Sequence, residues 1–197
     1  ISSGADTEEI SGRILELANY HRIHSQLKRE FGNVGGKDCL DAETGVFNAA
    51  FFTAHLRRVC ETMRLTQEPI SLMAIRVRPN AHFEISATKI NEAIAQIGTM
   101  LKSLVRMQDI TARMDADVFM IAFPSQDRAS VEPVIDRISG IVDCAAFESD
   151  DAEKGAFIMT IEAAIVEHMD HEDSDFLIGT AMSELTGEPI YSDKKTA

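Results

Sequence analysis

The apolar positions of this chain follow two periods, one typical of helices and one typical of strands. Between residues 6 and 31, apolar side chains recur every three or four residues, which predicts an amphipathic helix. A glycine-rich break comes next, at residues 32–36. We therefore expect residues 1–38 to form an N-terminal helical linker or stalk, separate from the rest of the chain.

After this break, helical and strand-like patterns alternate along the chain. The helical spacing covers residues 48–64, 84–105, 127–142 and 173–185, and the strand-like runs cover residues 70–77, 110–115, 117–123 and 156–166. This order predicts an α/β (α+β) domain over residues 39–187, with a central mixed or antiparallel sheet surrounded by helices. Residues 188–197 are expected to form a C-terminal tail. Local pattern does not fix the order of the strands in the sheet.

The stretch RMQDITARMDADVF, residues 106–119, joins a charged pair to a strand–turn–strand pattern. Asp115 and Ala116 are predicted to form a two-residue hairpin turn, a place that favours Gly or Asn because positive φ angles are required there. Ala116 lacks that freedom. The turn therefore indicates a lost catalytic motif, while the pair Arg106-x-x-Asp109 is intact.

Composition excludes several classes of partner. The formal net charge of −13 argues against a nucleic acid or an anionic membrane as the general partner, because both would be repelled. The chain has 3 widely spaced cysteines, which fits a reducing, cytoplasmic setting, and it has no signal peptide and no membrane-spanning apolar run. Because it begins at Ile1 and not at Met, we expect it to be part of a longer protein.

Two motifs in order resemble the GGDEF domain of diguanylate cyclases, which make cyclic di-GMP from two GTP. The run DAETGVFNA, residues 41–49, keeps most of the motif that opens the family's domain and ends in Ala49 where the family has Arg. The hairpin motif GG(D/E)EF is replaced by Asp115, Ala116, Asp117, Val118 and Phe119, preceded by Arg113 in its usual place. The resemblance covers about residues 39–186.

The resemblance implies which functions are lost. The family binds metal through an acidic fourth residue of the hairpin motif and an Asp on the first core strand. Here these places hold Val118 and Arg76. Mg²⁺ needs oxygen ligands, which neither residue offers in place of those carboxylates. We expect no enzymatic activity, no metal site and no cofactor.

The resemblance also implies what is kept. Product-inhibited members carry an Arg-x-x-Asp motif at the offset found for Arg106 and Asp109, and an arginine where Arg137 stands. Guanidinium groups bond guanine or phosphate, and a carboxylate accepts hydrogen bonds from the guanine edge. Such a pair is also common at helix ends, Arg137 could be a solvated helix residue, and Arg113 could bind ligand or only pack.

The leading hypothesis is a catalytically inactive receptor that binds cyclic di-GMP and acts through a homodimer, an upstream receiver domain or a downstream protein partner. The alternatives are a nucleotide-independent dimerisation or interaction scaffold and, third, a residually active diguanylate cyclase.

Overall fold

The computed structural model describes residues 39–150, 155–168 and 173–187 of the chain. The chain divides into two compact units, Ile1–Cys39 and Leu40–Ala197, and the described residues belong almost entirely to the second. The predicted helix over residues 6–31 and the predicted tail over residues 188–197 lie outside the described residues.

The second unit is an α+β domain, in which the described residues form four helices and one six-stranded sheet. Its elements in chain order are β1 (Phe47–Asn48), α2 (Ala49–Thr66), β2 (Ile70–Asn80), α3 (Ala87–Leu104), β3 (Ile110–Arg113), β4 (Val118–Pro124), α4 (Arg128–Asp143), β5 (Ala146–Glu148), β6 (Ala156–Glu167) and α5 (Ser174–Thr186). The predicted order of helices and long strands is confirmed, with boundaries that shift by up to 3 residues. The short strands β1 and β5 were not predicted.

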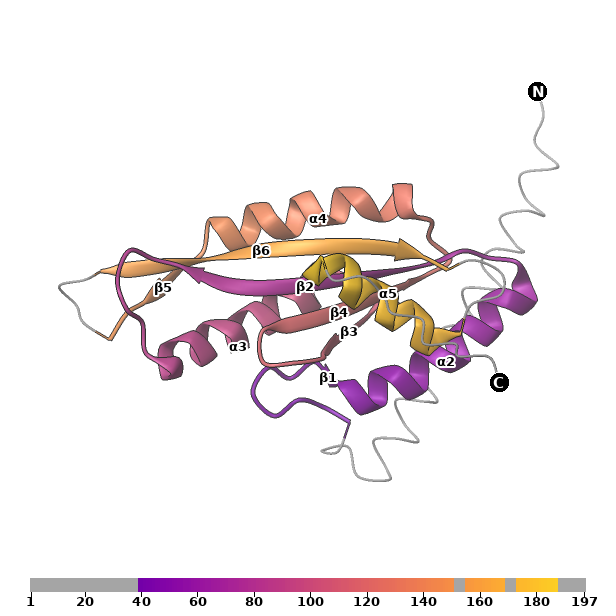
Figure 1. The fold of residues 1–197 in the computed structure, drawn as a ribbon, viewed down its shortest axis with the longest axis horizontal. Coiled ribbons are helices and arrows are strands. Elements are labelled where there is room, and N and C mark those ends of the chain that lie inside the picture. The colour runs from indigo at the N-terminus through magenta and orange to yellow at the C-terminus, as the bar shows by residue number, and fades with distance from the viewer. Residues whose placement is uncertain (1–38, 151–154, 169–172, 188–197) are drawn as a thin grey trace, which may run out of the picture. The chain divides into compact units, whose positions relative to one another are not determined.

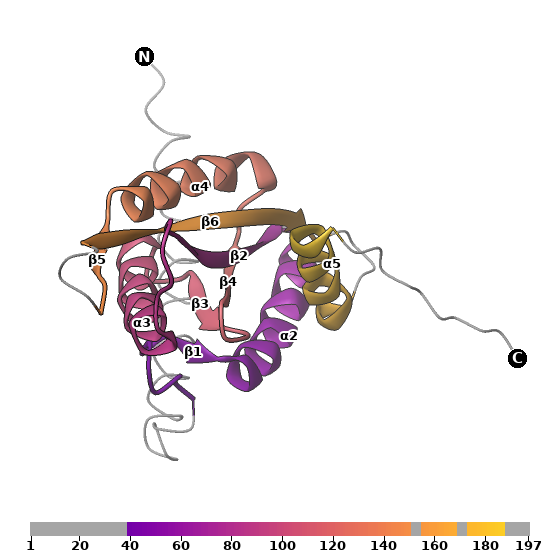
Figure 2. The same cartoon turned by 60° about the vertical axis from the view of Figure 1, so that its left-hand side comes forward.

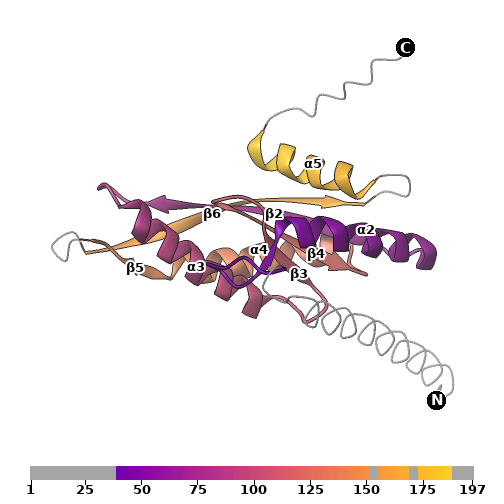
Figure 3. The ribbon, with the colours of Figure 1, turned by 90° about the horizontal axis from the view of Figure 1, so that it is seen from below.

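The sheet has the strand order β1-β3-β4-β2-β6-β5, and all its pairs are antiparallel except the parallel pair of β1 and β3. It is curled, with helices on both faces (Figures 1 and 2). On one side α5 packs on β6 and β2, and α2 packs on β1, β3 and β4 (Figure 3). Helices α3 and α4 cover the other face, where α4 packs on β6.

The two faces carry separate apolar cores because side chains of a strand alternate between its faces. The core under α3 and α4 includes Met73, Ile75, Val77, Phe119, Ile121, Ile97 and Leu101. The core under α2 and α5 includes Leu72, Ala74, Met120, Ala122, Phe52 and Leu56. Strands β2 and β4 lie in the middle of the sheet, so both faces of β4 are buried along its whole length. This explains why its sequence is a continuous apolar run.

The hairpin between β3 and β4 differs from its prediction. The strands end at Arg113 and begin again at Val118, so the loop is Met114–Asp117 and not a two-residue turn. The loop is closed by hydrogen bonds from the N–H groups of Met114 and Asp115 to the Val118 carbonyl, at 2.8 and 3.2 Å. Among the described non-glycine residues, only Gln67 and Ser125 have a positive φ. Ala116 is therefore tolerated because the wider loop does not require a left-handed residue there.

Candidate functional site

The Arg106-x-x-Asp109 pair forms a tight turn between the end of α3 and the start of β3. The Asp109 N–H donates to the Arg106 carbonyl at 3.1 Å, and the Arg106 N–H donates to Asp109 Oδ2 at 2.8 Å. The carboxylate thus closes the turn that carries it, as Asp side chains commonly do. This holds Asp109 in place and leaves the side chain of Arg106 exposed.

Asp109 is buried, with 8% of its surface exposed. Its second oxygen, Oδ1, accepts a hydrogen bond from Gln126 Nε2 at 3.3 Å. Burial raises the pKa of Asp109, although the Arg106 N–H and the charges of Arg106 and Arg137 act in the opposite direction. A carboxylate has about four acceptor positions, so each oxygen can still accept a further hydrogen bond.

Arg137 reaches the same place from α4. Its Nη2 donates to the carbonyl of Leu104 at 2.6 Å, two residues before Arg106, and its charge acts on the Asp109 carboxyl. The fold therefore brings together Arg106, Asp109 and Arg137 at the C-terminal end of α3. Two exposed arginines beside a fixed carboxylate can bind a ligand that carries both an anionic group and hydrogen-bond donors.

Arg113 is engaged at the other end of β3. Its guanidinium donates to the Asp115 and Ala116 carbonyls at 3.2 and 2.8 Å, and to the carboxylates of Asp41 and Glu43 at 3.3 and 2.5 Å. Its side chain is only 10% exposed. Arg113 thus ties the hairpin loop to the loop before β1, and the structure does not bring it into the cluster of Arg106, Asp109 and Arg137.

A second charged cluster lies where β2 meets the hairpin. Arg76 on β2 is the direct cross-strand partner of Val118 on β4 and of Glu162 on β6. Its Nε lies 3.8 Å from Asp117 Oδ2, and its Nη1 lies 3.9 Å from Glu162 Oε2. The Arg76 side chain is 16% exposed, so this guanidinium supplies the positive charge between two carboxylates.

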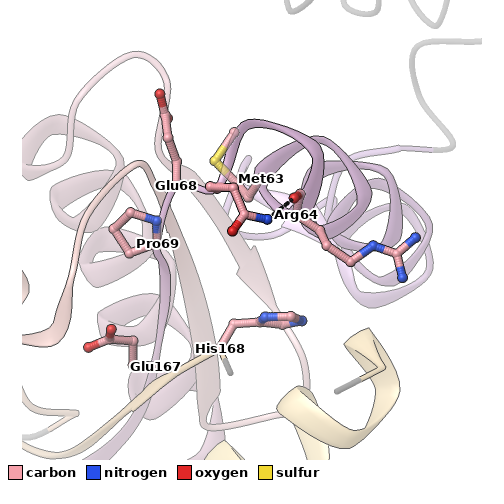
Figure 4. A pocket seen from close by; sticks show the side chains of 7 residues that line it. Met63, Arg64, Glu68, Pro69, Glu167 and His168 are labelled. Carbon is pink, nitrogen blue, oxygen red and sulfur yellow. Dashed lines mark hydrogen bonds between the residues drawn. The ribbon is translucent and has the colours of Figure 1, made fainter. Parts of the chain in front are cut away.

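A pocket of about 260 Å³ lies elsewhere, between the end of α2 and the end of β6 (Figure 4). Arg64, Glu68 and His168 are among its lining residues, and the Gln67 side-chain amide donates to the Arg64 carbonyl at 2.9 Å. None of the described residues that line it belongs to the predicted site. The pocket offers a mixture of charges and no single kind of ligand chemistry.

Two absences hold for the described ranges alone. Within residues 39–150, 155–168 and 173–187, no helix is long and apolar enough to cross a membrane. The same residues contain no group of three or more His, Cys, Asp or Glu side chains that could hold a metal ion.

The described domain is an α+β fold in which the β3–β4 hairpin pairs with β2 in the middle of the sheet. The sequence profile of the diguanylate cyclase GGDEF domain matches residues 39–187, which is more than half of the chain. The chain therefore belongs to the GGDEF domain family. No curated protein matches it in sequence.

Solved GGDEF structures share the fold at low sequence identity. The GGDEF domain of DgcB from Caulobacter crescentus, in complex with c-di-GMP, is 16% identical, with a TM-score of 0.69 over 76% of this chain and 86% of that chain. The FimX GGDEF domain from Pseudomonas aeruginosa is 13% identical, with a TM-score of 0.66 over 76% and 92%. The diguanylate cyclase SiaD from Pseudomonas aeruginosa, in complex with its activator SiaC, is 18% identical, with a TM-score of 0.68 over 93% and 70%. At these identities the likeness establishes the fold.

Sequence reasoning missed three residues that the structure places in these clusters. Gln126 contacts Asp109, Glu43 contacts Arg113, and Glu162 contacts Arg76. Each pair is far apart in sequence, so no local pattern could have joined them. Residues 156–166 were predicted as a strand, but the strand order was needed to find the partner of Glu162.

The Asp41 carboxylate makes a contribution to stability that depends on pH. Burial acts to raise the pKa of Asp41, but hydrogen bonds from Thr44 and the charge of Arg113 outweigh it and hold the pKa below 3.8. A carboxyl whose pKa is lowered in the folded state stabilises that state at pH values above its pKa in the unfolded chain. This stabilisation is lost as the pH falls through the pKa of the folded state. Asp41→Asn is therefore expected to be about 1 kcal/mol less stable than the wild type at neutral pH.

The measurement for Asp41→Asn is urea unfolding at a series of pH values. The difference from the wild type should shrink as the pH falls below 3.8, the ordinary value for Asp. A difference that stays constant between pH 7 and pH 3 would show that Asp41 acts through shape and not through its charge.

Proposed function

We propose that this GGDEF domain is a catalytically inactive receptor that binds cyclic di-GMP through Arg106, Asp109 and Arg137. One observation carries the proposal: two elements far apart in sequence bring two arginines to bear on one fixed carboxylate. The DgcB domain with the same fold is a complex with c-di-GMP, which supports this choice of ligand.

The chemistry of the three side chains suits a guanine dinucleotide. A guanidinium can donate two hydrogen bonds to guanine O6 and N7 or pair with a phosphate. The Asp109 carboxylate can accept from guanine N1–H and N2–H₂, the edge that distinguishes guanine from adenine. Asp109 is already held by the N–H of Arg106, so little ordering is required when a ligand binds.

The loss of catalysis is inferred from the cross-strand pair of Arg76 and Val118. These two residues face each other in the register of β2 and β4, at the places where the family has its metal-binding carboxylates. A guanidinium and an isopropyl group offer no oxygen ligand to Mg²⁺, and the charge of Arg76 repels a cation. The residues present therefore do not fit a catalytic metal.

The wild-type protein is accordingly expected to form no cyclic di-GMP from GTP in the presence of Mg²⁺ or Mn²⁺. The measurement is chromatographic detection of product after prolonged incubation, with an active diguanylate cyclase as the positive control. Turnover that disappears in Asp117→Ala would overturn the assignment of the domain as inactive, because Asp117 is the acidic residue of the hairpin loop that lies 3.8 Å from Arg76.

Binding is tested by calorimetric titration of the protein with cyclic di-GMP, with GMP as the control ligand. Heat of binding at micromolar concentrations is expected for the dinucleotide. If no heat of binding is observed, the receptor proposal is wrong and a nucleotide-independent scaffold is favoured. We further propose that the bound ligand changes a homodimer or a partner contact, since a ligand that bridges two surfaces stabilises the state in which they converge.

A further inference from the structure

We propose that Gln126 is a positioning residue of the cyclic di-GMP site, whose side-chain amide fixes Oδ1 of Asp109 and so orients the carboxylate for its ligand. This inference rests on the proposed function and adds a residue that does not contact the ligand. It concerns the loop between β4 and α4, which carries none of the three binding residues.

Gln126 is itself held firmly. It is 6% exposed, and its carbonyl accepts a hydrogen bond from the hydroxyl of Ser71, a fully buried residue of β2, at 3.0 Å. The residue before it, Ser125, has a φ of 56°. The residue after it, Asp127, caps α4 by accepting from the Ser130 N–H at 2.9 Å. Gln126 is thus fixed on both sides.

The amide of Gln126 completes the support of Asp109. The Arg106 N–H holds Oδ2 and Gln126 Nε2 holds Oδ1, so both oxygens are fixed and the carboxylate plane cannot rotate freely. A side-chain amide does not ionise in the physiological pH range, so Gln126 can donate this hydrogen bond at any such pH. Without the Gln126 amide, Asp109 Oδ1 would lose its buried hydrogen-bond partner. The carboxylate could then rotate away from the guanine edge that it is proposed to bind.

The donor also favours the charged form of the carboxyl. Burial raises the pKa of Asp109, and the groups that act against burial are the N–H and charge of Arg106 from its own turn and the charge of Arg137 from α4. Gln126 adds a neutral donor from a third element, and a hydrogen bond to a carboxylate stabilises its ionised form. Only the ionised form can accept both hydrogen bonds of a guanine edge.

The first test uses the free protein and needs no ligand. The titration of the Asp109 side chain is followed by ¹³C NMR in the wild type and in Gln126→Met, which keeps the length of the side chain and removes the donor. The midpoint for Asp109 is expected to move to higher pH in Gln126→Met. An unchanged midpoint would overturn the assignment of Gln126.

The second test measures affinity against pH. Gln126→Met is expected to bind cyclic di-GMP about 10-fold more weakly than the wild type below the Asp109 midpoint that NMR gives for this variant, with a smaller loss above that midpoint, because the carboxyl ionises as the pH rises. A purely structural role would weaken binding equally below and above the midpoint and would overturn the proposal. If the wild type itself does not bind, the proposed function fails, whereas the NMR titration still decides whether Gln126 governs Asp109.

A second variant, Gln126→Glu, replaces the amide donor by a carboxyl. Gln126→Glu has nearly the same size and would place a second carboxyl against Asp109, so the two groups would share a proton. Its expected Asp109 midpoint is higher than that of the wild type, with weaker binding at neutral pH. Equal titration and affinity in Gln126→Glu and the wild type would contradict the role assigned to the amide.

Discussion

Arg106→Ala is expected to abolish measurable binding of cyclic di-GMP, while Lys102→Ala binds like the wild type. A hydrogen bond to a charged group contributes about 1.5–3 kcal/mol, so the loss of two such bonds weakens binding about 100-fold or more. Lys102 is an exposed residue in the last turn of the same helix, α3. Lys102→Ala therefore removes one positive charge, as Arg106→Ala does, at a residue outside the cluster of Arg106, Asp109 and Arg137.

The companion variants separate the contributions within the cluster. Arg137→Ala is expected to lose about 10-fold in affinity, less than Arg106→Ala, since one Nη2 donor of Arg137 already bonds the Leu104 carbonyl. Asp109→Asn is preferable to Asp109→Ala because its amide oxygen can still accept from the Arg106 N–H and keep the turn closed.

These affinities are compared by calorimetry at one ionic strength, with the unfolding midpoint of every variant as the control for folding. Equal affinity of Arg106→Ala and Lys102→Ala would show that the ligand binds elsewhere. A loss in Asp109→Asn together with unchanged binding in both arginine variants would assign the site to the carboxylate alone.

The second large effect concerns stability. A methyl group added at Gly98 on α3 would lie 2.6 Å from Thr44 Cβ, closer than real Cβ atoms approach a neighbour, while Phe119 Cε1 at 3.4 Å would be in ordinary contact. Thr44 cannot retreat easily, because it is 4% exposed and both its N–H and its hydroxyl bond the Asp41 carboxylate. Gly98→Ala is expected to destabilise the domain by about 1–3 kcal/mol from overpacking.

Two other helical glycines provide matched controls. A Cβ at Gly140 on α4 or at Gly179 on α5 would meet nothing within 4 Å. Gly140→Ala and Gly179→Ala are therefore expected to stabilise the domain by about 0.5–1 kcal/mol, because Ala loses less backbone freedom than Gly in a helix. Urea unfolding of the three variants measures the difference. If Gly98→Ala is as stable as the controls, α3 can move away from the loop that carries Thr44.

The order of helices and long strands was predictable because each has its own hydrophobic period. Apolar residues recur every three to four positions over residues 84–105, and residues 156–166 form a mostly apolar run of strand length, so tertiary context only adjusts their ends. The strand Ala146–Glu148 is too short to carry a period of its own. It forms because β6 offers it a partner edge, which local pattern cannot report.

The candidate site was predictable only in part, because local pattern does not show contacts between residues far apart in the sequence. The family offset pointed to Arg106 and Asp109, and the fold brings Arg137 beside them. The hydrogen bonds that hold Asp109 could not be read from spacing, because Gln126 reaches it from another loop across the fold. For Arg113 the sequence left two roles open, ligand binding and packing. Its four hydrogen-bond partners, two in the hairpin loop and two in the loop before β1, indicate a packing role.

The cross-strand placement of Arg76 against Val118 has a consequence for the evolution of this domain. A Glu at position 118 alone would face Arg76 directly across the strands and pair with it in place of a metal. An Asp at position 76 alone would add a third carboxylate beside Asp117 and Glu162, and like charges repel. Neither change alone therefore builds a metal site of the family's kind. Under the proposed function, a return to synthesis therefore requires both changes together.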